Sequence, residues 1–257
     1  MCFDIDSRPP LPPISGSALD SRDVTLTAGD GTRVAAFAAR AAAPTGAGIV
    51  ICPDVRGLVP YYEELALRFA EAGVDAVAFD YFSRTAGTGK RDGDFDYQPQ
   101  VALTRTETLY QDVAAAAEYL RTPEGGAVER LFSVGFCFGG RLSFLQASRP
   151  ELDLAGVIGF YGWPAGPHRT GLPSPAELAP KFRCSVLALF GGADQGIPAE
   201  AREEFDGALD EAGKTHVTVV YDGAPHSFFD RKAAEFADAS SDAWMRMLGF
   251  MGVGSEH

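Results

Sequence analysis

Short apolar runs alternate with longer amphipathic stretches along most of the chain, and this alternation predicts its secondary structure. The apolar runs are bounded by Gly, Pro or Asp, which is typical of strands buried on both faces of a parallel sheet. We expect such strands at Gly48–Cys52, Val74–Phe79, Leu131–Val134, Ala155–Phe160 and Ser185–Phe190. A further β-rich run covers Thr215–Tyr221.

The stretches between these runs carry helical periodicity and helix end signals. Tyr61–Ala72 ends before a glycine, and Pro198–Ala212 begins with a proline that suits a first helical turn. Further helices are expected at Val101–Arg121, Cys137–Ser148 and Asp230–Leu248. The long segments Ser83–Gln100 and Gly162–Pro180 are expected to be loops, of the kind that form lids or pocket walls.

The beginning of the chain follows a different pattern. Residues 1–20 are rich in proline and predict an extended arm, and residues 21–257 predict a single domain. Two strands, Asp23–Ala28 and Arg33–Ala39, flank a Gly-Asp-Gly hairpin signal. Strand-then-helix repetition behind a hairpin predicts an α/β fold whose mostly parallel central sheet is flanked by helices and opens with an antiparallel hairpin.

Composition narrows the function classes. The 257 residues include 22 Lys and Arg against 35 Asp and Glu, a net charge of −13, which argues against nucleic acid and anionic membranes as partners. No apolar run approaches the roughly 18–20 residues of a membrane span, and the N-terminus lacks signal-peptide features. The four cysteines are scattered, without a C-x-x-C pair. We therefore expect a cytoplasmic protein with reduced thiols, a monomer or small homo-oligomer, acting on a small molecule.

The strongest chemical motif is G-F-C-F-G-G, which spans residues 135–140 between an expected strand and an expected helix. A G-x-nucleophile-x-G turn needs small flanking residues because the turn is tight and its backbone strained. The following helix N-terminus would favour a thiolate on Cys137, and the amide of Phe138 would face a developing oxyanion. The alternative is a glycine-rich turn that holds a buried, inert cysteine.

Two later residues complete a catalytic order. Asp194 and His226 each follow an expected strand, and the order nucleophile, acid, histidine is that of α/β-hydrolases. A free cysteine is only a few per cent thiolate at neutral pH, so it needs a base, which His226 would supply. Asp194 would fix the histidine tautomer. The alternative for Asp194 is a turn before Pro198.

With these motifs the chain resembles the dienelactone hydrolase family, cysteine-using members of the α/β-hydrolase superfamily, from about residue 22 to 250. The resemblance implies an α/β-hydrolase fold and hydrolysis of an enol-lactone or activated ester through a cysteinyl acyl-enzyme, without metal or organic cofactor. It places Asp54 where the family has a glutamate that contacts the resting thiol, and it implies an oxyanion hole of the Val55 and Phe138 amides.

The resemblance also suggests substrate-binding residues. Arg84 matches a family arginine that binds a substrate carboxylate. The family's second arginine would fall at Asp230, and Arg231 comes one residue later, which on a helix turns the side chain by about 100°. Ser227 and Trp163 are further substrate-binding candidates. Convergence of both arginines on Cys137 would favour a carboxylated lactone, and divergence a larger, more apolar substrate.

Three other functions fit the same residues. The acyl-cysteine could pass to a nucleophile other than water, which would make the protein a cyclase or acyltransferase of secondary metabolism. A thioesterase or peptidase-like enzyme would use the same triad. A catalytically silent binding module would keep the fold alone.

Overall fold

The eight strands of the protein form one mixed sheet in the order β1-β2-β4-β3-β5-β6-β7-β8. This computed structural model describes residues 3–13, 20–168 and 171–254. β2 is antiparallel to both β1 and β4, and the remaining neighbours are parallel. The expected mostly parallel sheet with an N-terminal antiparallel hairpin is therefore confirmed.

All eight expected strands are present. Their bounds are β1 Asp20–Thr27, β2 Arg33–Arg40, β3 Ala47–Cys52, β4 Asp75–Phe79, β5 Arg130–Phe136, β6 Gly156–Phe160, β7 Ser185–Gly191 and β8 His216–Tyr221. Every residue of β3, β4 and β6 is buried, as expected of strands covered on both faces. The described part of the expected arm, residues 3–13, forms no helix or strand, and residues 1–2 and 14–19 lie outside the described ranges.

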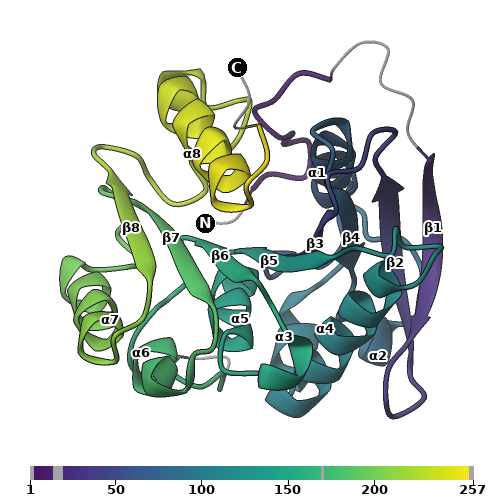
Figure 1. Cartoon of the computed structure of the whole chain (residues 1–257), viewed down its shortest axis with the longest axis horizontal. Helices are drawn as coiled ribbons and strands as arrows, with labels where there is room; N and C mark the ends of the chain where they lie inside the picture. Colours follow the sequence, from purple (N-terminus) through teal and green to yellow (C-terminus); the bar gives the residue numbers. More distant parts are fainter. Residues whose placement is uncertain (1–2, 14–19, 169–170, 255–257) are drawn as a thin grey trace.

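Helices cover both faces of the sheet. They are α1 Pro60–Glu71, α2 Ser83–Ala86, α3 Gln98–Leu103, α4 Thr106–Arg121, α5 Phe138–Gln146, α6 Pro175–Leu178, α7 Ala199–Glu211 and α8 Ala237–Phe250, with 3₁₀ turns at Pro150–Leu152, Ala179–Lys181 and Ala234–Phe236. Figure 1 shows α1 and α8 on one face and α4, α5 and α7 on the other. Helices on both faces of one sheet make a three-layer α/β architecture, with the core on the two sides of the sheet.

Three predictions of helix or loop extent were wrong. The expected helix Val101–Arg121 is broken, because Thr104 and Arg105 adopt extended backbone. Their side chains satisfy carbonyls at the end of α3: the Thr104 hydroxyl donates to Val101 at 2.8 Å. The helix expected from Asp230 begins only at Ala237. The two long loops also contain short helices, α2 and α6.

The parallel strands all end at one edge of the sheet, and this edge collects the segments that carry the candidate chemistry. β3, β5, β7 and β8 point the same way, so the residues that follow them emerge on the same side. Open α/β sheets place ligands at this carboxyl edge. The fold thus brings together residues that lie far apart in the sequence.

Candidate active site

Cys137 alone forms the turn between strand β5 and helix α5, as the sequence predicted. β5 ends at Phe136, α5 begins at Phe138, and the backbone of Cys137 has φ 55° and ψ −112°. Residues with a side chain seldom adopt this conformation. A Cβ on Gly139 would lie 2.1 Å from the carbonyl oxygen of Cys52. Only glycine therefore allows the start of α5 to pack against the end of β3, and the cysteine is held at the tip of its strand.

His226 and Asp194 meet beside this turn. Asp194 lies three residues after β7, and His226 five residues after β8. Nδ1 of His226 is 2.6 Å from Oδ2 of Asp194. The second carboxylate oxygen of Asp194 accepts the backbone N–H of Gly196 at 2.8 Å, so both oxygens have fixed partners. The carboxylate can therefore hold the imidazole in one orientation.

The electrostatics of His226 follow from these contacts. Burial disfavours the imidazolium, but hydrogen bonds to Asp194 and to Cys137 outweigh it and raise the pKa of His226 to about 9. Burial likewise opposes ionisation of Asp194, yet the hydrogen bond to His226 keeps its pKa below the usual value. The structure thus joins the three side chains in one hydrogen-bonded chain in which the histidine holds its proton firmly.

The oxyanion hole was expected at two backbone amides, those of Val55 and Phe138. Phe138 is the first residue of α5, so its amide has no partner one turn earlier. Val55 lies three residues beyond β3, the strand that pairs with β5. Among the residues that the structure describes, no hydrogen bond uses the Val55 amide. Both donors can therefore serve an oxygen that belongs to a ligand.

Asp54 forms a buried ion pair with Arg56. Its carboxylate accepts from Nη2 of Arg56 at 2.8 Å and from the Arg56 backbone N–H at 2.8 Å. Only 1% of the Asp54 side chain is exposed. The loop is fixed further by the hydroxyl of Tyr62, which accepts the Asp54 backbone N–H at 2.9 Å. An acid that modulates the thiol would have to share its charge with Arg56, so this role of Asp54 stays a prediction.

Arg84 is engaged by protein carboxylates. Its Nε and Nη2 donate to Asp112 at 3.0 and 2.8 Å, and its Nη1 donates to Asp30 at 2.6 Å. Asp112 belongs to α4 and Asp30 to the β1–β2 turn, and neither position was expected near the site. Burial raises the pKa of Asp112 to about 6, although Arg84 acts in the opposite direction. A substrate carboxylate would have to compete with these two acids for Arg84, so its expected role in binding such a group stays a prediction.

The other three substrate-binding candidates occupy different surroundings. Arg231 is exposed, and its backbone N–H donates to the carbonyl of Arg8 at 3.0 Å. Ser227 follows His226 with a φ of 59°. Trp163 packs against the core, and its carbonyl accepts from a buried arginine of α5. Of the two arginines that were expected to form a clamp, Arg84 thus pairs with protein carboxylates, and Arg231 donates its backbone N–H to Arg8.

Some residues near the site had no role in the sequence-based predictions. Arg141 is 1% exposed and donates to the carbonyls of Trp163, Gly166 and Leu172, so it holds the loop before α6. The sequence feature that could have pointed to this residue is a single charge in an apolar helix, directly after two glycines. The Tyr61 hydroxyl of α1 donates to a carbonyl in the histidine loop, and nothing in the sequence marked that contact.

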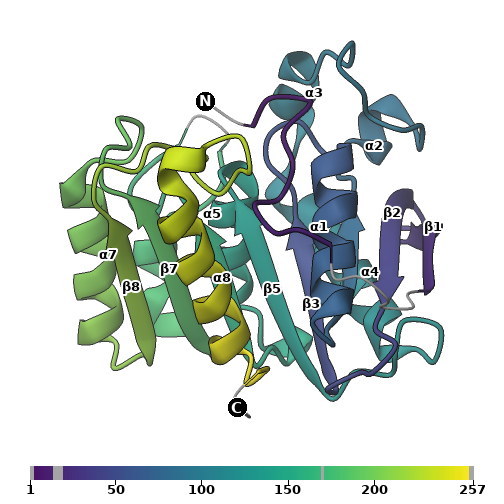
Figure 2. The same cartoon turned by 90° about the horizontal axis from the view of Figure 1, so that it is seen from above.

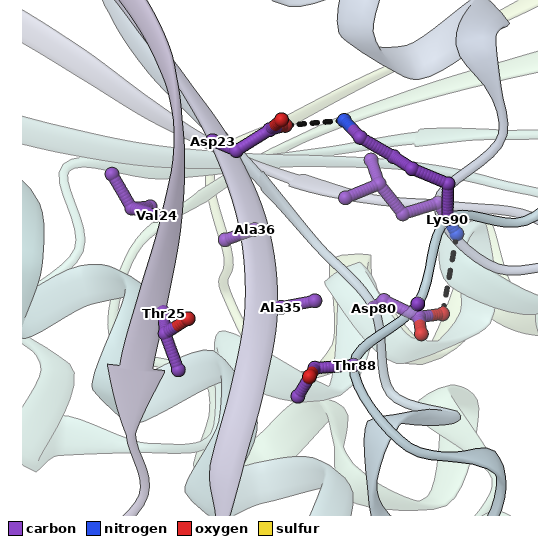
Figure 3. Close-up of a pocket in the computed structure, with 10 residues that line it drawn as sticks. Asp23, Val24, Thr25, Ala35, Ala36, Asp80, Thr88 and Lys90 are labelled. Atoms are coloured by element: carbon purple, nitrogen blue, oxygen red, sulfur yellow. Dashed lines mark hydrogen bonds and ion pairs between the residues drawn. The ribbon is translucent and has the colours of Figure 1, made fainter.

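A separate cavity of about 260 Å³ lies between the β1–β2 edge and the segment after β4 (Figure 3). Its lining includes Asp23, Asp80 and Lys90. Lys90 pairs with Asp23 and with Glu63, and Asp80 pairs with Arg91 at 2.7 Å. None of the expected catalytic side chains lines this cavity, and each of these three charged side chains has an oppositely charged partner.

Known proteins support the family resemblance. A protein of Methylorubrum extorquens named "Putative carboxymethylenebutenolidase" is 29% identical over 202 residues, which cover 77% of this chain and 69% of that protein. The Bradyrhizobium protein "Probable 2-oxo-3-(5-oxofuran-2-ylidene)propanoate lactonase" is 27% identical over 211 residues, covering 79% and 82%. The crystal structure of a "Putative Dienelactone Hydrolase" from Klebsiella pneumoniae superposes with a TM-score of 0.79 at 26% identity, over 91% of this chain and 99% of that one.

Two further findings complete the comparison. Within the described ranges, the helices are all too short or too polar to cross a membrane. Residues 34–254 match the sequence profile of the dienelactone hydrolase family. With its α/β-hydrolase fold and its relatives, the chain therefore belongs to the dienelactone hydrolase family and is a dienelactone hydrolase-like hydrolase.

Proposed function

We propose that this protein hydrolyses an enol-lactone or activated ester through an acyl-enzyme on Cys137, with His226 as acid and base and Asp194 as its orienting acid. The observation that carries the proposal is the hydrogen-bonded chain from Cys137 through His226 to Asp194, whose last link is 2.6 Å long. The hydrogen-bonded chain ends at Cys137, whose strained turn suits a nucleophile that must be exposed at the tip of its strand.

In the first half-reaction the Cys137 sulfur attacks the ester carbonyl, and its thiol proton resides on His226. The oxyanion that forms accepts hydrogen bonds from the backbone N–H groups of Val55 and Phe138, and each such donor stabilises the transition state by about 3 kcal/mol. When the carbon–oxygen bond breaks, His226 gives its proton to the leaving oxygen. A lactone opens in this step and stays attached as a thioester.

In the second half-reaction water replaces the leaving oxygen. His226 takes a proton from water, whose oxygen attacks the thioester carbonyl, and the same two amides hold the second oxyanion. The carbon–sulfur bond then breaks, the carboxylic acid leaves, and the proton returns to Cys137. Asp194 keeps the protonated nitrogen of the imidazole directed at itself in both steps.

The contacts of the arginines favour a substrate without an essential carboxylate. A carboxylate could displace Arg84 from Asp112 only by leaving a buried acid unpaired. Since Arg84 is paired with Asp112 and Arg231 is exposed, we favour a larger, more apolar ester or lactone as the substrate. Parallel assays of a neutral and a carboxylated enol-lactone test this, and a preference of more than about tenfold for the carboxylated compound would contradict it.

The central test is Cys137→Ala in an assay of p-nitrophenyl acetate and a neutral enol-lactone. We expect turnover to fall by at least about 10³-fold, and intact mass to show an acetyl adduct on the wild type but not on the variant. Cys184→Ala is the matched control, because burial raises the pKa of the Cys184 thiol to about 12 and leaves it unreactive. Full activity of the Cys137→Ala variant would refute the proposal.

The same experiments separate the other candidate functions. An acyltransferase would form the adduct but would release product only with an added alcohol or amine. A cyclase would release a ring closed by a nucleophile of the acyl group itself. A thioesterase would prefer an acyl-pantetheine thioester over the enol-lactone. A silent binding module would form no adduct at all.

A further inference from the structure

The N-terminal arm lies against the loop that carries His226. In Figure 2 the arm, in dark purple, runs between α1 and the segment that leads into α8. The arm itself has no regular secondary structure over residues 3–13. Residues 222–233, between β8 and the 3₁₀ turn before α8, also belong to no helix or strand. Neither segment has a ladder of its own, so contacts with other elements must fix both.

The polar contacts between the two segments centre on Asp230. The hydroxyl of Ser7, a residue with no solvent exposure, donates to Oδ2 of Asp230 at 2.6 Å. The backbone N–H of Arg8 donates to Oδ1 at 3.3 Å, and the Arg231 N–H returns a bond to the Arg8 carbonyl at 3.0 Å. Both oxygens of this carboxylate therefore accept donors from the arm, four residues after the candidate catalytic histidine.

The apolar contacts lead to the same loop. Phe3 is 4% exposed and stacks on Tyr61 with ring centroids 4.1 Å apart. The Tyr61 hydroxyl in turn donates to the Phe229 carbonyl at 2.6 Å. Phe3 also meets the edge of Tyr161 at 6.2 Å, and the Tyr161 ring lies 4.8 Å from the His226 ring. Phe3 is thus one aromatic ring away from His226.

We propose that the arm is a working part of the catalytic site, in which Ser7 and Phe3 are positioning residues that fix the His226 loop through Asp230 and Tyr161. The inference rests on the proposed function of His226. Hydrolysis needs the imidazole to point at Cys137 in both half-reactions, and small displacements of a catalytic group cost large factors in rate. The arm adds buried contacts from a distant part of the chain to the short-range turn hydrogen bonds that the loop makes around Asp230.

The main variant is Ser7→Ala, which removes one buried hydroxyl and adds no bulk. We expect kcat for p-nitrophenyl acetate to fall about tenfold, because the loop loses a buried donor to Asp230. KM should change less than about twofold, because the arm acts through His226 and not on the ester itself. Asp6→Asn is the matched control: it breaks only the exposed Asp6–Lys232 pair between the same segments and should stay within about twofold.

Two measurements separate positioning from simple stability. Hydrogen exchange of the Arg231 amide, which is bonded to the Arg8 carbonyl, should be at least about tenfold faster in Ser7→Ala than in Asp6→Asn. The pH dependence of Cys137 alkylation by iodoacetamide should also shift, because the thiol shares its proton with His226. Phe3→Leu, which keeps an apolar anchor, should show a smaller loss of kcat in the same direction.

The outcomes decide between the possibilities. A lower melting temperature with unchanged kcat and alkylation profile would overturn the proposal and leave the arm a structural cover. A loss of kcat without faster exchange at Arg231 would overturn it too. If wild-type turnover does not depend on Cys137, the proposed function fails, whereas the exchange measurement still reports whether the arm holds the loop.

Discussion

Asp194→Asn tests the proposed triad most directly, because neither orientation of the new amide keeps both contacts that the carboxylate accepts. One oxygen of Asp194 faces Nδ1 of His226 at 2.6 Å, and the other accepts the Gly196 N–H at 2.8 Å. An asparagine has a single oxygen. If it serves Gly196, its NH₂ group faces Nδ1 and moves the imidazole proton to the nitrogen on the Cys137 side. If it serves His226, two N–H groups meet at 2.8 Å.

The magnitude follows from the first orientation, which avoids the clash. A histidine that carries its proton on the nitrogen facing the thiol cannot accept one, so general-base catalysis is lost. The corresponding change in a serine triad costs about 10⁴ in kcat. We therefore expect kcat/KM to fall by about 10³–10⁴, or about 4–5.5 kcal/mol of transition-state stabilisation. The alkaline limb of the profile should also move to lower pH, because His226 loses the carboxylate that raises its pKa to about 9.

The assay is kcat/KM for p-nitrophenyl acetate from pH 5 to pH 10, on the variant and on Asp206→Asn. Asp206 is a matched control because it too pairs with a histidine, His216 at 3.0 Å, but 43% of its side chain is exposed. We expect this control to keep its activity within about twofold. A variant Asp194→Asn that retains more than a tenth of wild-type activity, or a control that falls in parallel, would refute the reasoning.

Three further predictions concern stability and pH. Gly139→Ala should lower the melting temperature and reduce the free energy of unfolding by about 2–3 kcal/mol, because its Cβ would meet two backbone carbonyl oxygens at 2.1 and 2.2 Å. Gly207→Ala in α7, where nothing lies within 4 Å of the new Cβ, should instead raise the free energy of unfolding by up to about 1 kcal/mol. Denaturant titration distinguishes the two. Arg84→Ala should cost about 3–5 kcal/mol by leaving buried Asp112 unpaired, yet change kcat/KM for a neutral lactone less than about twofold; a selective kinetic loss would restore Arg84 to the site. Folding raises the pKa of His226, so the protonated histidine stabilises the folded state by at most about 3 kcal/mol. This contribution is complete below about pH 6.5 and is lost as the pH rises through about 9. Melting temperatures measured across that pH range will follow the loss.

The contacts of Arg84 and Arg231 show what a local sequence pattern leaves open about a site. Arg84 sits at the position that the family resemblance marks, one residue into the short helix α2. Its partners come from the β1–β2 turn and from α4, 54 and 28 residues away in sequence. Arg231 is displaced by one residue, and the position before it holds an aspartate that binds the arm. Residue types and spacing can be read from a single sequence, but the distant carboxylate that will pair with a given arginine cannot.

The sequence by itself determined the eight strands, the strand–cysteine–helix turn and the order in which Cys137, Asp194 and His226 follow their strands. These features depend on hydrophobic periodicity, on glycine where the backbone is crowded and on residue order, all of which are local. Only the tertiary structure decided that Asp54 pairs with Arg56, that Arg84 pairs with Asp112, and that the arm reaches the His226 loop. The first of these contacts is local, between residues two apart, and the other two join segments that lie far apart in the sequence. All three depend on side-chain geometry and burial, which exist only once the chain has folded.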